Sequence, residues 1–471
     1  MSPFSRSGDS SVEASNGLPA LTIASRSAPG RNGNRSHRPA EVVYDITRLV
    51  TRALNPSPNG IDRVDFAFAR HFLSAPQNHS AAFICTCLGQ GLAAAEGAMR
   101  SIDGIETYWN EFVDARDDSI YESVVSVLCG ASKRDAHEAR IKRGFGANLI
   151  SENWQALRQW AFFRGQPLTE AREGAIYFNA SQFLLDKAWY LRWLDRRKDV
   201  KAVFFVHDLL PIDFPEFFWP GEPESHERRM RNICRLGAGV IVGTQAVARR
   251  LEAFAAEQGR RNLAICVARP PVADIFETSE PPDGRLVALN YFVVCGTIEP
   301  RKNHLMLLNI WRELASRGPA PKLVVVGKRG WLCQNVLDVL DRSDALRAHV
   351  IEAGGLSTPG LRRLLAGARA LLAPSFAEGF GIPVAEAIAA GAPVIASEIE
   401  VFREIGGDAL DYIDPLDGVG WLRAIEDYAR PDSTRRAEAV ARLAQVRCAS
   451  QDEFGSKVDE FLSGIAALGH D

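Results

Sequence analysis

The sequence has no apolar run long enough to cross a membrane. A spanning helix needs roughly 18 or more such residues, and no stretch of the 471 residues reaches that length. The N-terminus also lacks the compact apolar core of a secretory signal. We therefore expect a cytoplasmic protein, with peripheral contact to the inner face of the cytoplasmic membrane as a further option.

Paired cysteines and a strong charge of one sign are missing too. The eight cysteines are scattered and form no CxxC pair, which excludes a disulfide framework or a zinc site and favours reduced, buried thiols. A formal net charge of -3 gives no general attraction to nucleic acid. No DxD motif ends a predicted strand, so no metal is predicted.

Length and composition indicate more than one domain. The chain is 46% hydrophobic and 24% charged, and 471 residues are too many for a single core. Residues 1–39 are rich in Ser, Arg, Gly and Asn, so they are predicted to form a flexible tail, to which we assign no function.

Short β-branched or aromatic runs alternate with helix-like stretches from residue 41 onward. Runs that are apolar on both faces are typical of parallel sheets covered by helices on both sides. The first series of predicted strands begins at Val42, Ala81, Ala175, Ala202 and Gly239, and the second at Tyr291, Lys322, His349, Ala370 and Pro393.

The two series predict an α/β protein of two doubly wound Rossmann-like domains that face each other across a cleft. The paired prolines in residues 268–285 suit a connector between them. We predict an N-terminal domain over residues 40–280, a C-terminal domain over 286–432, and helices over 433–471 whose packing the pattern leaves open.

Ligands of such sheets bind beyond the carboxyl ends of the strands. The segment from Pro374 to Gly391 places Glu378 in a strand-to-helix turn and Glu386 in the first turn of the next helix. Gly379 and Gly381 would let a ligand approach the backbone, and the helix N-terminus would attract an anion. A phosphate-bearing ligand explains this pattern, whereas the alternative is that both carboxylates have only structural roles.

Two more strand ends carry polar residues. Arg301 and Lys302 follow the first strand of the second series, where a diphosphate would need cationic donors. His207 and Asp208 end a buried strand of the first series, which favours a functional and a structural histidine about equally. Asn59 to Val64, which includes Gly60 and Arg63, is a weaker anion-compatible turn.

These residues together resemble a known family. The spacing from Glu378 to Glu386 is similar to the E-x7-E signature of family 4 of the retaining glycosyltransferases, which have the GT-B fold. EGFGIPVAEAIAAGAPVIAS, GTIEPRKNH, VVVGKRGW and HDLLPIDFPEF resemble a bacterial branch with many mannosyltransferases that builds O-antigens and exopolysaccharides. The resemblance is strong from Tyr291 to Pro415 and patchier before Arg285.

The resemblance implies a role for each matching residue. The ribose hydroxyls of a nucleotide sugar would bind Glu386, and those of the donor sugar would bind Glu378. Gly379, Phe380, Gly381, Gly327 and Arg301 would contact the donor, Lys302 would stabilise the departing diphosphate, and His207 would lie beside the reacting sugar. Gly60, Arg63 and Asp208 would belong to an acceptor or phosphate loop.

Many relatives carry an arginine six residues before the lysine, where this chain has Gly296 and Thr297. Arg301 is a candidate substitute for it. The nucleotide sugar, with GDP-mannose as the first choice and a UDP-sugar as the alternative, would be a substrate, and no cofactor is implied.

The acceptor implied by the resemblance is a lipid-linked oligosaccharide or a growing polysaccharide. Residues 133–164 mix basic and aromatic side chains, which suits anionic lipid headgroups and equally suits an ordinary amphipathic helix. A GT-B nucleotide-sugar epimerase and a catalytically inactive glycan- or nucleotide-binding protein are the alternative functions, and the sequence leaves the oligomeric state open.

Overall fold

A computed structural model describes the chain at residues 41–52, 58–74, 80–109, 118–131, 163–278 and 280–468, without the side chains of residues 107–109. The tail predicted over residues 1–39 lies outside the described residues. The basic and aromatic segment predicted over 133–164 also lies outside them, apart from its last two residues.

The first half of the described chain forms a seven-stranded sheet in the order β3-β2-β1-β4-β5-β6-β7. Neighbouring strands are parallel, except that β3 is antiparallel to β2. The strands are β1 (Val42–Asp45), β2 (Ser80–Thr86), β3 (Gly89–Ala94), β4 (Ile176–Asn179), β5 (Lys201–Val206), β6 (Gly237–Val242) and β7 (Ala264–Val267). Strands β1 and β4 are buried along their whole length, as expected for strands covered on both faces.

Helices in this half of the chain separate most of the strands. They are α1 (Thr47–Thr51), α2 (Gly60–Leu73), α3 (Ala95–Trp109), α4 (Ser119–Leu128), α7 (Ala188–Arg196), α8 (Leu210–Asp213), α9 (Glu222–Leu236) and α10 (Gln245–Glu257), with 3-10 turns η2 (Leu168–Glu170), η3 (Pro215–Phe217) and η4 (Asp274–Glu277). One face of the sheet shares a core with α2, α3 and α19, and the other shares a core with α7, α9 and α10.

The second half forms a six-stranded parallel sheet in the order β10-β9-β8-β11-β12-β13. Its strands are β8 (Tyr291–Cys295), β9 (Lys322–Val326), β10 (Val350–Glu352), β11 (Leu371–Ala373), β12 (Val394–Ser397) and β13 (Asp411–Ile413). The chain reverses direction across the sheet between β8 and β11, and ligands of doubly wound sheets bind at such a switch point.

Helices cover this sheet as well. They are η5 (Pro300–Lys302), α11 (His304–Arg317), α12 (Gln334–Arg342), α13 (Asp344–Arg347), α14 (Thr358–Gly367), α15 (Ile382–Ala389), α16 (Glu400–Gly406), α17 (Gly418–Ala429) and α18 (Thr434–Leu443). The last helix described is α19 (Gln451–Ala467), which packs elsewhere. Every predicted strand is present, and the prediction of two doubly wound α/β domains is confirmed.

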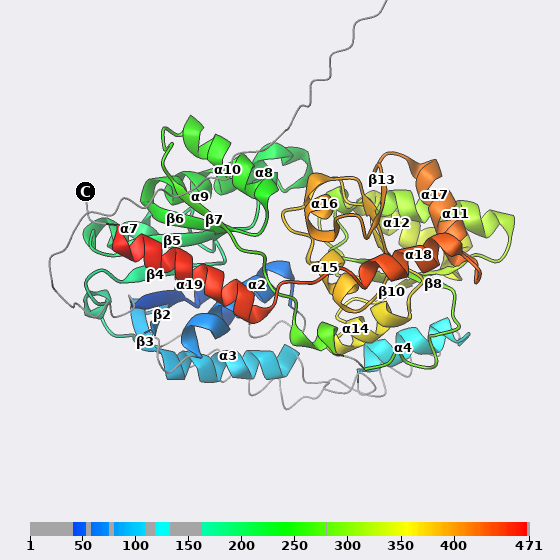
Figure 1. Cartoon of the computed structure of the whole chain (residues 1–471), viewed down its shortest axis with the longest axis horizontal. Coiled ribbons are helices and arrows are strands. Elements are labelled where there is room, and N and C mark those ends of the chain that lie inside the picture. Colours follow the sequence, from blue (N-terminus) through cyan, green and yellow to red (C-terminus); the bar gives the residue numbers. More distant parts are fainter. Residues whose placement is uncertain are drawn as a thin grey trace, which may run out of the picture. The chain divides into compact units, whose positions relative to one another are not determined.

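The two predicted C-terminal helices pack on different sheets. Leu443 of α18 belongs to the core of the second sheet. In α19, Phe454, Val458 and Leu462 join the core of the first sheet beside α2, where the red helix lies in Figure 1. The chain therefore returns to its first domain at its C-terminal end.

Helix α4 lies in the first half of the sequence but packs on the second sheet. We assigned it to the N-terminal domain by its place in the sequence, but Ile120, Tyr121 and Val124 are buried in the core of the second sheet. Asp118 caps α4 through the Ile120 amide at 2.8 Å and also accepts the Ser357 amide at 2.8 Å, just before α14. Figure 1 shows α4 beside α14. Its apolar face determines this position, which order along the chain does not reveal.

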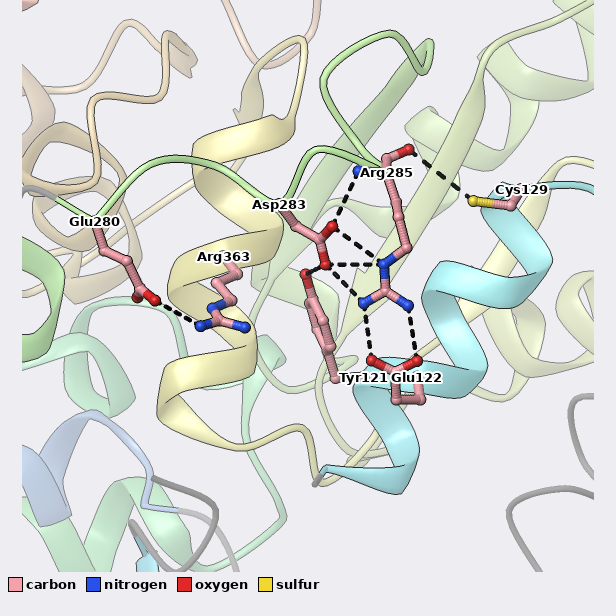
Figure 2. A network of polar contacts seen from close by, with 7 residues as sticks. All are labelled: Tyr121, Glu122, Cys129, Glu280, Asp283, Arg285 and Arg363. Carbon is pink, nitrogen blue, oxygen red and sulfur yellow. Dashed lines mark hydrogen bonds and ion pairs between the residues drawn. The ribbon is translucent and has the colours of Figure 1, made fainter. Parts of the chain in front are cut away.

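Polar contacts fasten α4 to the connector (Figure 2). Arg285 donates to both carboxylate oxygens of Glu122 at 2.8 Å and to Asp283 at 2.7 Å. The hydroxyl of Tyr121 donates to Asp283 at 3.0 Å. The hydrogen bonds from Arg285 lower the pKa of Asp283 to about 2, so this carboxylate stays ionised.

A buried carboxyl group in α2 makes the first domain sensitive to pH. The Tyr44 hydroxyl donates to one oxygen of Asp65 at 2.5 Å, and the other oxygen has no hydrogen-bond partner among the described residues. Burial raises the pKa of Asp65 from 3.8 to about 7, although the Tyr44 hydrogen bond opposes the shift. The folded state therefore binds the proton more tightly, and stability falls as the pH rises from about 4 to 7.

Replacing Asp65 by asparagine should stabilise the protein at pH 8, because no charge is then buried. We expect the free energy of unfolding to rise by up to about 4 kcal/mol at pH 8 and by less than half of that at pH 5. Urea unfolding at both pH values measures the change. Asp62→Asn is the control and should destabilise, since Asp62 pairs with Arg48 and Arg52. An equal effect of Asp65→Asn at both pH values would contradict the prediction.

Candidate functional site

Two cations and one carboxylate meet at the switch point of the second sheet. Arg301 and Lys302 form η5 after β8, and Glu378 lies in the turn between β11 and α15. The Nη1 atom of Arg301 lies 2.6 Å from Glu378 Oε2, and Lys302 Nζ pairs with Oε1. The Phe376 amide also donates to the Arg301 carbonyl at 2.8 Å, which ties the two turns together.

The charges in this cluster stabilise one another. Burial would raise the pKa of Glu378, but Arg301 and Lys302 outweigh it and lower the pKa to about 2. Arg301 Nε also lies 2.8 Å from Glu299, which is buried. Burial raises the pKa of Glu299, and the two cations oppose the shift. Glu299 was not predicted, although an acidic residue two positions before Arg301 was a readable signal.

The turn after Glu378 touches the first domain at its backbone. A Cβ on Gly379 would lie 2.4 Å from the carbonyl oxygen of His207, so only glycine fits there. Gly381 has φ of +87°, in the left-handed region that favours glycine. The hydroxyl of Thr244, at the start of α10, donates to the Gly379 carbonyl at 3.1 Å. The turn is thus held by both domains.

Glu386 corrects one prediction. Helix α15 begins at Ile382, so Glu386 is its fifth residue and does not lie in the first turn, because Gly381 caps the helix. Its carboxylate instead pairs with Arg63 of α2, whose Nε lies 2.9 Å from Oε1 of Glu386. The side chain of Glu386 is 4% exposed, and that of Arg63 is 19% exposed. This contact lacks hydrogen-bond geometry, and Oε1 has no hydrogen-bond partner in the described part of the chain. Burial raises the pKa of Glu386, and Arg63 partly offsets the shift.

The start of α2 brings the predicted phosphate loop to the same place. Asn59 and Asp62 form a capping box, and Asp62 also binds Arg48 at 2.7 Å, which fixes the first helical turn. A Cβ on Gly60 would lie 3.2 Å from the side chain of Ile382 in α15. The loop therefore abuts the helix that carries Glu386.

His207 is neutral. Burial lowers its pKa to about 3. Its Nε2 atom lies 2.8 Å from the Ala180 carbonyl, which can only accept, so Nε2 carries the proton and Nδ1 is an acceptor. Burial raises the pKa of the neighbouring Asp208, against the effect of Arg301.

The low pKa of His207 predicts that this ring does not titrate near neutral pH. We expect its NMR signals to stay constant from pH 5 to 8, with a His207→Gln variant to assign them. Because the folded pKa lies below the ordinary value of 6.5, protonation favours the unfolded state, and this group reduces stability as the pH falls below 6.5. A titration midpoint between pH 6 and 7 would contradict the prediction.

A cavity of about 520 Å³ lies between these groups. It is lined by every residue predicted for the site, namely Gly60, Arg63, His207, Asp208, Arg301, Lys302, Gly327, Glu378, Gly379, Phe380, Gly381 and Glu386. The structure brings them together, while their roles remain predictions. Reasoning from the sequence missed other lining residues, including Gln182, Phe218, Glu222, Arg229 and Trp331.

Within the described ranges, no three His, Cys, Asp or Glu side chains gather as a possible metal site. Metal independence stays a prediction. No helix of the described chain is both long and apolar enough to span a bilayer.

Comparison with known proteins finds a family match in the second half of the chain. Residues 278–413 match the family of glycosyl transferases group 1. The second domain is therefore similar to the group 1 glycosyltransferases. The matched residues include the turns that carry Arg301, Lys302 and Glu378, and the helix that carries Glu386.

Curated relatives of this chain include mannosyltransferases. The serotype-specific mannosyltransferase WbdA of Escherichia coli is 29% identical over 240 residues, which are 48% of this chain and 29% of WbdA. The O-antigen chain mannosyltransferase B of Escherichia coli is 33% identical over 161 residues, 33% of this chain and 41% of that protein. The chain thus matches less than half of the length of these relatives.

Solved structures share the fold of this chain. Anabaena HepE in complex with UDP-glucose has a TM-score of 0.55 and 14% identity, covering 90% of this chain and 100% of HepE. The E. coli trehalose-6-phosphate structure bound with UDP-2-fluoro glucose has a TM-score of 0.55 and 11% identity, covering 91% and 100%. The predicted GT-B fold is confirmed.

Proposed function

We propose that this chain is a retaining glycosyltransferase that moves a sugar from a nucleotide sugar to a lipid-linked oligosaccharide or growing polysaccharide of the cell surface. The first-choice donor is GDP-mannose, and a UDP-sugar is the alternative. The observation that carries the proposal is the meeting of Arg301, Lys302 and Glu378 with Glu386 in one cavity lined by both domains. The mannosyltransferase relatives and the UDP-sugars in the related folds support it.

The proposed donor contacts follow from the chemistry of the lining. The oxygen of Glu386 that pairs with Arg63 but lacks a hydrogen-bond partner among the described residues suits the ribose hydroxyls, and Glu378 suits hydroxyls of the donor sugar. Lys302 and Arg301 would face the diphosphate. Gly296 has a φ of +134°, which strains any side chain, so this position does not suit the arginine of many relatives. We therefore assign the second cation to Arg301.

The chemical step asks mainly for electrostatic stabilisation. Cleavage of the glycosyl phosphate bond puts negative charge on the diphosphate and positive charge on the sugar ring. Cations already fixed in place stabilise that charge without reorganising. In the proposed front-face route the departing phosphate takes the proton of the acceptor hydroxyl, so neutral His207 contacts the sugar and need not act as an acid. No metal or separate cofactor is proposed.

A panel of nucleotide sugars tests the function. We expect GDP-mannose or a UDP-sugar to raise the melting temperature, and the same donor to label lipid extracts or polysaccharide. Incubation with donor alone should yield no epimer, which separates the transferase from an epimerase. If no nucleotide sugar binds, the proposal is wrong.

A further inference from the structure

Two aromatic side chains that the proposed donor contacts do not use line the same cavity. Phe218 follows η3 in the first domain, and Trp331 follows β9 in the second. The indole Nε1 of Trp331 donates to the Phe217 carbonyl at 2.9 Å. Phe217 in turn stacks on Phe376, with ring centroids 5.9 Å apart and planes 16° apart. Both lining residues are half-buried, so each still presents part of its surface.

A charged pair of α9 lines the cavity as well. Arg229 Nη2 lies 2.5 Å from Glu222 Oε1. The Nε atom of Arg229 is buried and has no hydrogen-bond partner among the residues described. Glu222 is 38% exposed at its side chain, which leaves its carboxylate accessible. The pair is neutral overall and offers both donors and acceptors.

His226 links this pair to the predicted reacting centre. Its Nε2 atom donates to the Asp208 carbonyl at 3.1 Å, so Nδ1 is an acceptor. Burial and the neighbouring Arg229 lower the pKa of His226 to about 4, which keeps the ring neutral. Asp208 follows His207 directly, so α9 is coupled to the strand end where the sugar is proposed to react.

We propose that Phe218, Trp331, Glu222 and Arg229 form a subsite for a neutral pyranose ring of the acceptor glycan. A pyranose has an apolar C–H face that packs on aromatic rings and an edge of hydroxyls that suits a carboxylate and a guanidinium. A prenyl or acyl chain would leave the charged pair without solvent. An anionic headgroup gains nothing from a neutral pair. The inference rests on the proposed function and names the acceptor class.

Saccharide binding tests the subsite, with methyl α-mannoside and α-linked mannobiose as probes. Saturation-transfer NMR and titration are carried out with the full-length chain in the presence of GDP or UDP. We expect Phe218→Ala, Phe218→Leu and Glu222→Gln to weaken mannobiose binding by about 10-fold or more. Nucleotide affinity should stay within about 2-fold, and acceptor KM should rise while kcat changes little.

The matched control is Trp189→Ala, since Trp189 is 51% exposed and does not line this cavity. Its saccharide binding should equal that of the native chain. Phe218→Leu keeps the apolar volume, so it remains informative if the alanine variant folds poorly. Trp331→Phe removes the hydrogen bond to Phe217 and keeps a ring, and should weaken saccharide binding less than Phe218→Ala.

Three results would overturn the subsite. Unchanged mannobiose binding in Phe218→Leu and Glu222→Gln would remove its basis. A selective loss of nucleotide binding in Trp331→Phe would assign that ring to the base. Phe218-dependent binding to phosphatidylglycerol vesicles would assign the surface to lipid. A native chain that binds no nucleotide sugar would instead defeat the proposed function itself.

Discussion

Lys302→Met should reduce the rate of sugar transfer by roughly 100- to 1000-fold at saturating donor. The expectation follows from the charge that develops on the leaving diphosphate, for which one preplaced cation contributes about 3 to 4 kcal/mol. The free energy of unfolding should change by less than the activation free energy of transfer, because Glu378 keeps its ion pair with Arg301 at 2.6 Å. Single-turnover transfer and thermal unfolding measure the two effects.

Two further substitutions serve as comparisons for Lys302→Met. Lys302→Arg keeps the charge and should retain more activity than the methionine variant. Lys322→Met is the matched control, because Lys322 lies in β9 of the same domain and does not line the cavity. The one contact described for its amine is a hydrogen bond to the Ala348 carbonyl. A Lys302→Met variant with nearly native kcat would remove this residue from the proposed mechanism.

Glu386→Gln should weaken donor binding by roughly 10- to 100-fold. The carboxylate would accept charge-assisted hydrogen bonds from the ribose, each worth about 1.5 to 3 kcal/mol. The raised pKa of Glu386 adds a pH effect, because protonation removes the charged acceptor, so native donor affinity should fall as the medium becomes acidic. Isothermal titration with the nucleoside diphosphate at several pH values measures both the effect of the substitution on affinity and the pH dependence of the native affinity.

Glu398→Gln is the control for Glu386, since Glu398 pairs with Arg403 at the surface. A double-mutant cycle with Arg63→Met tests the contact seen at 2.9 Å. The two substitutions should not be additive, because either one breaks the same pair. Donor affinity that is equal in Glu386→Gln and the native chain would contradict the assignment.

Much of the fold was readable because buried parallel strands have continuous apolar runs. The strands that were missed are short or poor in such residues. β3 carries Gly89 and Gly91 and pairs antiparallel at an edge, and the edge strands β7 and β13 have only four and three residues. Helix α4 could not be placed from the sequence, since amphipathicity predicts a buried face but does not name the sheet that buries it.

The site was readable to the extent that its chemistry follows strand ends. Turns after β5, β8 and β11 supplied His207, Lys302 and Glu378, and all three line the cavity. The pairing of Glu386 with Arg63 depends on the meeting of α15 with α2, about which spacing along the chain says nothing. Phe218 and Trp331 stand far apart in the sequence, and the hydrogen bond from Trp331 to the Phe217 carbonyl shows that the fold brings their segments together.

The exchange of α4 and α19 between the sheets limits how this protein can be engineered. A chimaera that grafts residues 286–432 from a relative, to change donor choice, would keep the native α4 against a foreign surface and lose the complementarity of Tyr121 and Val124 to their neighbours. Expression of either half alone would expose to water the apolar surface on which α4 or α19 packs. A functional graft must carry residues 118–131 together with the second sheet and leave α19 with the first.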